Sequence, residues 1–132
     1  PAYIGALKAS IERHLSTLSF QPDLILASFH GMPQRTLELG DPYHCHCQKT
    51  ARLLQEALGR PVEVSFQSRF GRAKWLEPAT DAVLEDLPGR GVKRVAVVAP
   101  GFSVDCLETR EELAIRGRES FEAKGGTDFA YI

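Results

Sequence analysis

One histidine stands where an apolar segment of the chain ends. Residues 24–29 read Leu-Ile-Leu-Ala-Ser-Phe, which is typical of a buried strand, and His30 follows at once. Open parallel α/β sheets bind their ligands at the carboxyl ends of the strands, so His30 occupies a position suited to chemistry. Neutral imidazole can act as a general base or bind a metal ion, and it can also be a purely structural hydrogen-bonding group. Position and residue type leave these alternatives open.

Two carboxylates follow a second apolar segment. Residues 95–99 are typical of another strand, and Asp105 and Glu108 come soon after it. An Asp followed three positions later by a Glu is also typical of a capping box at the start of a helix. The two roles are compatible, since Asp105 can cap the helix while Glu108 faces a pocket. The two strand ends can therefore bring His30 and these carboxylates to one pocket.

A third group of polar side chains follows a segment in which apolar and polar residues alternate. It consists of Gln67, Ser68 and Arg69, with Trp75 close behind. Such a group at the carboxyl end of a strand suits a pocket for a large flat ligand. It equally suits a loop whose tryptophan packs on the core.

The run His44-Cys45-His46-Cys47 has the residue types of a metal site. However, neighbouring side chains in a helix point about 100° apart, because the helix has 3.6 residues per turn. Zinc sites commonly use separated ligand pairs instead. We therefore interpret this run as a partly exposed start of a helix.

The pattern of apolar residues predicts the elements that position these side chains. Strands alternate with helices, which predicts an α/β fold with right-handed crossovers and a four-stranded parallel sheet. The expected helices are 2–18, a segment that begins at Asp41-Pro42 and ends at Gly59, 78–87 and 105–124. The expected strands are 23–29, 62–66, 93–99 and 127–132.

The length and composition set outer limits on the function. The 132 residues suit one domain, and a net charge of −1 gives no indication of nucleic-acid binding. The longest apolar runs are too short to span a membrane. Three cysteines at no disulfide-framework spacing favour a reducing, cytoplasmic compartment. The chain lacks an initiator Met, and we expect it to be a fragment of a longer protein.

Four segments, in order, resemble those of the ferrochelatases, which insert ferrous iron into a porphyrin in haem biosynthesis. Residues 28–33 are similar to the family's S-F-H-G-(I/L)-P segment, and residues 40–43 to its G-D-P-Y helix start. Residues 66–80 are similar to its F-Q-S-R-F-G…W-L-x-P-x-T run, and residues 100–109 to its P-G-F-x-x-D-C-L-E-T segment. The resemblance covers nearly the whole chain but only the C-terminal half of the family's usual length.

The resemblance implies a Rossmann-like three-layer domain, one of two such domains in the full enzyme, with the porphyrin cleft between them. Residues 20–132 would form the C-terminal domain, without its last part. Residues 1–19 would form an amphipathic lead-in helix at the domain junction, with an apolar stripe partly exposed here.

The resemblance also implies roles for single residues. His30 and Glu108 would be the catalytic pair on opposite walls of the cleft, each serving as a proton carrier or an iron ligand. Asp105 would be a proton relay. The porphyrin-binding residues would be Gln67, Ser68, Arg69 and Trp75.

The implied activity is insertion of Fe²⁺ into protoporphyrin IX to form haem, a lyase reaction. The alternatives are iron insertion into coproporphyrin, another tetrapyrrole chelatase activity, or a non-catalytic module that binds tetrapyrroles or metals. Fe²⁺ is then a substrate, and no cofactor is required. A 2Fe–2S cluster needs four cysteine thiolates, so none is expected in this fragment of three cysteines.

The implied partners are a porphyrin, ferrous iron and the missing N-terminal domain of the same chain. Because that domain would supply half of the cleft, we expect activity of the full-length enzyme rather than of the fragment. We expect a cytoplasmic protein, and the hydrophobic macrocycle of the substrate is compatible with peripheral contact with the inner membrane.

Overall fold

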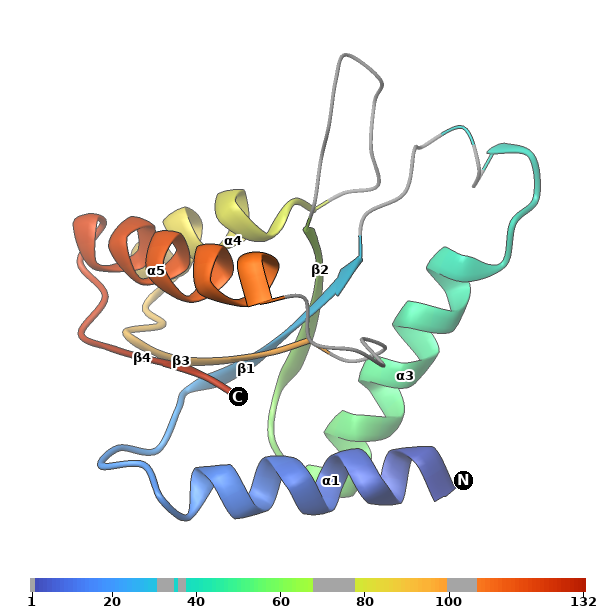
Figure 1. Cartoon of the computed structure of the whole chain (residues 1–132), viewed down its shortest axis with the longest axis horizontal. Coiled ribbons are helices and arrows are strands. Elements are labelled where there is room, and N and C mark those ends of the chain that lie inside the picture. The colour runs from blue at the N-terminus through green and yellow to red at the C-terminus, as the bar shows by residue number, and fades with distance from the viewer. Residues whose placement is uncertain (1, 31–34, 36–37, 68–77, 100–106) are drawn as a thin grey trace.

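The described strands form one parallel sheet (Figure 1). The computed structural model describes residues 2–30, 35, 38–67, 78–99 and 107–132. The strands are β1 (Leu24–His30), β2 (Val62–Gln67), β3 (Arg94–Val98) and β4 (Asp128–Tyr131). Their order across the sheet is β2-β1-β3-β4, and every neighbouring pair is parallel. The predicted α/β class and the parallel four-stranded sheet are therefore confirmed.

Helices cover both faces of this sheet, which gives the predicted three layers. On one side lie α1 (Ala2–Leu15) and α3 (Tyr43–Leu58), and on the other lie α4 (Thr80–Asp86) and α5 (Leu107–Ala123) (Figure 1). A short 3₁₀ helix, η1 (Leu87–Arg90), follows α4 directly. In the part of the chain that the structure describes, no helix is both long enough and apolar enough to cross a membrane.

Strand residues alternate between two cores, one on each face of the sheet. In β1, Ile25, Ala27 and Phe29 pack in the core beneath α1 and α3. Leu24 and Leu26 of the same strand pack in the core beneath α4 and α5. A strand buried on both faces reads as a continuous apolar run, which explains why residues 24–29 were recognisable from the sequence.

Helix α1 is part of the first of these cores. Its residues Ile4, Ile11 and Leu15 are buried there. The helix ends at Leu15, three residues before the predicted end. The hydroxyls of Ser16 and Thr17 donate to the carbonyl oxygens of Arg13 and His14, both at 2.7 Å, and such bonds compete with helix continuation. The proposed role of residues 1–19 at a domain junction stays a prediction.

Helix α3 begins one residue later than predicted and ends where the sequence predicted. The carboxylate of Asp41 accepts a hydrogen bond of 2.9 Å from the backbone N–H of Tyr43, where the helix begins. Pro42 is therefore the cap position rather than the first helical residue. At the other end, Gly59 has a φ of +67°, a conformation that glycine adopts without strain.

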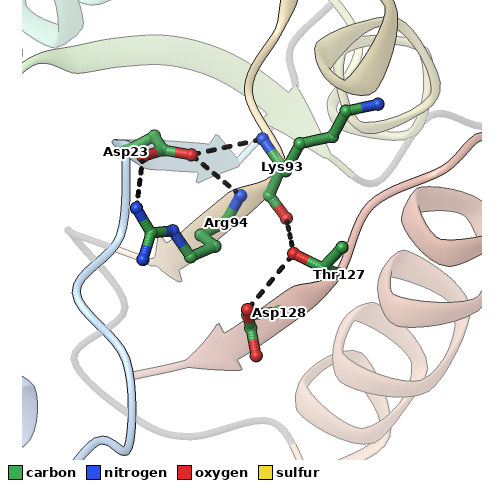
Figure 2. A network of polar contacts seen from close by, with 5 residues as sticks. All are labelled: Asp23, Lys93, Arg94, Thr127 and Asp128. Carbon is green, nitrogen blue, oxygen red and sulfur yellow. Dashed lines mark hydrogen bonds and ion pairs between the residues drawn. The ribbon is translucent and has the colours of Figure 1, made fainter.

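A network of exposed polar groups joins the amino ends of β1, β3 and β4 (Figure 2). The carboxylate of Asp23 accepts hydrogen bonds from the backbone N–H groups of Lys93 (3.3 Å) and Arg94 (3.2 Å) and from the Arg94 guanidinium (3.2 Å). The hydroxyl of Thr127 lies 3.0 Å from the carbonyl oxygen of Lys93 and 3.2 Å from a carboxylate oxygen of Asp128. We call these five residues the amino-end network.

Candidate active site

The structure places two of the predicted site residues side by side at the carboxyl end of the sheet. His30 is the last residue of β1 and Gln67 is the last residue of β2, and the two are Cα partners in the parallel register. His30 had been expected just after the strand, whereas its backbone is the final rung of the β1–β2 ladder. Positions 37 residues apart in the sequence are thereby brought together.

Glu108 is the second residue of α5, the helix that follows β3 along the chain. A place in the first turn of this helix is what the sequence predicted. The predicted site residues Ser68, Arg69, Trp75 and Asp105 lie outside the described residues. The convergence of His30 and Glu108 on one ligand therefore stays a prediction.

The chain leaves the sheet after Gln67 and rejoins it at the same end. The backbone N–H of Phe66 donates a hydrogen bond of 2.8 Å to the carbonyl oxygen of Pro78, and Phe66 and Ala79 form a parallel bridge. Both flanks of the segment between Gln67 and Pro78 are thus attached to β2. This segment carries three of the four predicted porphyrin-binding residues.

Three hydroxyls, which we call the hydroxyl cluster, lie directly beneath this end of the sheet. The Thr80 hydroxyl oxygen lies 2.7 Å from that of Ser28 and 2.8 Å from that of Ser65. Ser28 and Ser65 are completely buried and Thr80 is 2% exposed. This cluster was not predicted from the sequence. Its only sequence signal is a serine at the same place in two apolar strands, two residues before His30 and two before Gln67.

An aromatic cluster occupies the opposite face at the same end. Phe66 is completely buried, and its ring centroid lies 6.4 Å from Phe29, 6.5 Å from Tyr43 and 5.7 Å from His44. The His44 ring is stacked on Phe66, with an angle of 23° between the two planes. The first turn of α3 is thereby attached to β1 and β2. The end of the sheet has buried side chains on both faces.

The run from His44 to Cys47 spreads around the first turns of α3, as the helical geometry required. Cys45 and His46 are exposed, His44 is half-buried and Cys47 is buried. The predicted partly exposed helix start is confirmed. No group of three His, Cys, Asp or Glu side chains within the described ranges is arranged to hold a metal ion.

Burial controls the chemistry of Cys47. It raises the pKa of the Cys47 thiol from 9.0 to about 11, and the hydrogen bond with the Tyr43 side chain only partly opposes this effect. The thiolate is the form that attacks electrophiles and binds metals. Cys47 therefore remains a neutral, inert thiol at neutral pH and contributes packing to the core.

Comparison with known proteins covers the whole chain. The family model for ferrochelatase matches residues 1–132. The chain is 58% identical to a ferrochelatase of Rhizobium meliloti over 135 aligned positions, which cover 100% of this chain and 40% of that protein. It is 53% identical to a ferrochelatase of Agrobacterium fabrum and 58% identical to one of an Azoarcus species, covering 39% and 37% of those proteins. The chain therefore spans about two fifths of the length of these relatives.

Proposed function

The chain belongs to the ferrochelatase family, and from this premise we propose that it is the catalytic part of an enzyme that inserts Fe²⁺ into a porphyrin. We propose protoporphyrin IX as the porphyrin and haem as the product. The observation that carries the proposal is the pairing of His30 with Gln67 at the carboxyl end of the sheet. In parallel α/β sheets, this is the end at which ligands bind.

We further propose that residues 20–132 form one of two domains around a porphyrin cleft, the C-terminal one. The relatives are long enough for a second domain, since this chain covers 40% or less of each. In this arrangement α1 would serve both the core of this domain and the junction. The complete activity then belongs to the full-length protein.

The reaction requires two changes at the same four nitrogens. Two pyrrole N–H protons leave, and one Fe²⁺ enters, so the charge of the macrocycle's centre is conserved. We propose that His30 accepts a pyrrole proton or binds the entering iron, because neutral imidazole suits Fe²⁺. Glu108 would act from the opposite wall as a proton carrier or an oxygen ligand, with Asp105 as a proton relay.

Binding energy must also bend the macrocycle, since a flat porphyrin shields its nitrogens. Such distortion costs about 1–5 kcal/mol, supplied by contacts away from the reacting centre. We propose that Gln67, Ser68, Arg69 and Trp75 supply part of these contacts. The attachment of both flanks of this segment to β2 supports the proposal, because fixed flanks reduce the entropy lost on binding.

A histidine exchange tests the proposal in the full-length protein. His30→Ala should lower the rate of iron insertion at least about 100-fold, the range lost with a general base. His46→Ala is the matched control, because His46 is exposed on α3 and should leave the rate unchanged. Circular dichroism should show the same fold for both variants. Near-normal turnover of His30→Ala would refute the assigned role.

A substrate panel separates the remaining functions. Faster iron insertion into coproporphyrin than into protoporphyrin would replace the proposed substrate, and preference for cobalt would indicate another chelatase. Zinc gives a fluorescent porphyrin product, so porphyrin binding without that fluorescence would indicate a non-catalytic module. The full-length protein should need no added cofactor.

We propose a cytoplasmic enzyme with peripheral contact with the inner membrane, because the macrocycle of its substrate is largely apolar. Flotation of the full-length protein with lipid vesicles tests this contact. Protein that stays at the bottom of the gradient, with and without porphyrin, would contradict it.

A further inference from the structure

We propose that the hydroxyl cluster of Ser28, Ser65 and Thr80 positions the strand ends that carry His30 and Gln67 relative to the start of α4, and thereby supports porphyrin binding. This inference rests on the proposed function. The cluster joins three of the parts of the chain that lead into the site. Ser28 precedes His30 by two residues on β1, Ser65 precedes Gln67 by two residues on β2, and Thr80 begins α4 just after the segment that contains Trp75.

The geometry of the cluster makes Thr80 its central member. Ser28 and Ser65 are Cα partners on adjacent strands, and the Thr80 hydroxyl lies within hydrogen-bonding distance of both. One side chain at the start of α4 is therefore bonded to two strands at once. Removal of this hydroxyl leaves two buried serines without the bonds that they make to it.

The side chains around the cluster explain why its hydroxyl groups can fix the position of α4. Among the described residues, the core beneath α4 and α5 is otherwise built from aliphatic and aromatic side chains, including Leu26 and Leu84. Apolar contacts are non-directional, so they hold a helix against a sheet without fixing its exact position. Hydrogen bonds are directional, and in a buried site they are strong because water cannot replace them. The cluster therefore defines where α4 begins relative to the ends of β1 and β2.

A second contact adds to this attachment from the backbone side. The Phe66 N–H donates to the carbonyl oxygen of Pro78, two residues before Thr80. The return of the chain to the sheet is thus held by a backbone bond on one side and by the hydroxyl cluster on the other. Since Gln67 and Pro78 flank the proposed porphyrin-binding segment, the cluster fixes the two points of the sheet at which that segment is attached.

Porphyrin binding by the full-length protein tests the inference. Protoporphyrin IX is titrated in the absence of metal, and the dissociation constant is read from quenching of protein fluorescence. Thr80→Val keeps the shape of the side chain and removes the hydroxyl, and it should raise the dissociation constant about tenfold, because displacements of about 1 Å at a site have effects of this size or larger. Thr80→Ser keeps the hydroxyl and should bind porphyrin like wild type.

Two further variants complete the design. Thr127→Val is the matched control, because it removes a threonine hydroxyl from the amino-end network, and it should bind porphyrin like wild type. Ser65→Ala removes one of the two partners of Thr80 and should weaken binding about threefold. If Thr80→Val does not fold, as judged by circular dichroism, Ser65→Ala decides the question alone.

Steady-state kinetics distinguish positioning from a general loss of stability. The KM for porphyrin should rise in Thr80→Val and recover in Thr80→Ser, while the KM for Fe²⁺ stays unchanged. Wild-type binding by Thr80→Val, or equal impairment of Thr80→Ser and Thr80→Val, would overturn the inference. A wild-type protein that binds porphyrin without inserting iron would refute the proposed function and leave the binding comparison intact.

Discussion

The two ends of the sheet are held together by different physical means. At the amino end, the amino-end network of charged side chains and backbone groups joins β1, β3 and β4 at the protein surface (Figure 2). At the carboxyl end, the hydroxyl cluster lies on one face of β1 and β2 and the aromatic cluster, centred on buried Phe66, on the other. Water competes with the bonds at the first end but does not reach the three buried hydroxyls at the second.

This difference predicts where the protein tolerates change. Exposed ion pairs contribute about 0–1 kcal/mol, because solvent screens them and replaces their hydrogen bonds. A buried hydroxyl that loses its partner costs about 1–3 kcal/mol. The carboxyl end, where His30 and Gln67 lie, should therefore be the more sensitive of the two. Four experiments test that contrast, from the largest expected effect to the smallest.

Phe66→Ala should lower the free energy of unfolding by about 3–5 kcal/mol, the range for removal of a buried aromatic ring. Phe66 is the centre of the aromatic cluster and is completely buried. Urea denaturation measures the loss, and Phe66→Leu, which fills part of the same volume, should lose less. A loss below about 1 kcal/mol in Phe66→Ala would show that the carboxyl end does not depend on this cluster.

A pair of threonine exchanges compares the ends directly. Thr80→Val should cost about 1–3 kcal/mol of unfolding free energy, because two buried serine hydroxyls lose a partner. Thr127→Val should cost less than about 1 kcal/mol, because water can reach the exposed groups that it leaves. Thermal or urea unfolding of both variants measures the difference. Equal losses would remove the contrast between the ends.

Asp23→Asn should destabilise the protein by less than about 1 kcal/mol at neutral pH, because the ion pair with Arg94 is exposed. In the wild type, desolvation raises the pKa of Asp23, but hydrogen bonds from Arg94 and Lys93 and the charge of Arg94 together bring it below its ordinary value of 3.8.

The direction of that pKa shift fixes the pH dependence of the Asp23 effect. The unfolded chain binds the proton more tightly, so the stabilisation is present above about pH 4 and is lost as the pH falls through the folded-state pKa. The difference between wild type and Asp23→Asn should therefore shrink in urea titrations from pH 5 down to pH 3. A difference that grows with acid would contradict this assignment.

The rates of cysteine alkylation measure how accessible the two thiols of α3 are. This comparison does not depend on a change in the free energy of unfolding. At pH 8, iodoacetamide should modify exposed Cys45 at least about tenfold faster than buried Cys47, whose pKa is raised to about 11 by burial. Fragmentation mass spectrometry distinguishes the two sites. Equal rates would show that water reaches Cys47 as readily as Cys45.

The raised pKa of Cys47 also predicts a pH dependence of stability. Because the fold keeps Cys47 protonated, the free energy of unfolding should decline between pH 9 and 11.

The sequence by itself determined the elements and the class of the fold. Apolar periodicity and turn residues predicted α1, α3, α4, α5 and the four strands to within a few residues, whereas the 3₁₀ helix η1 was expected to be a turn. The strand that ends at His30 was visible since it is buried on both faces. The end of α1 was wrong by three residues, because the hydroxyls of Ser16 and Thr17 hydrogen-bond to the preceding turn.

Only the tertiary structure decided which distant residues meet. The bond between Ser28 and Thr80 spans 52 positions and the pairing of His30 with Gln67 spans 37, so neither produces a local pattern. The burial of Cys47 and the exposure of Cys45, two residues away, likewise depend on what α3 packs against. Local periodicity records whether a residue is buried, whereas the identity of its neighbours depends on how strands and helices are ordered in space.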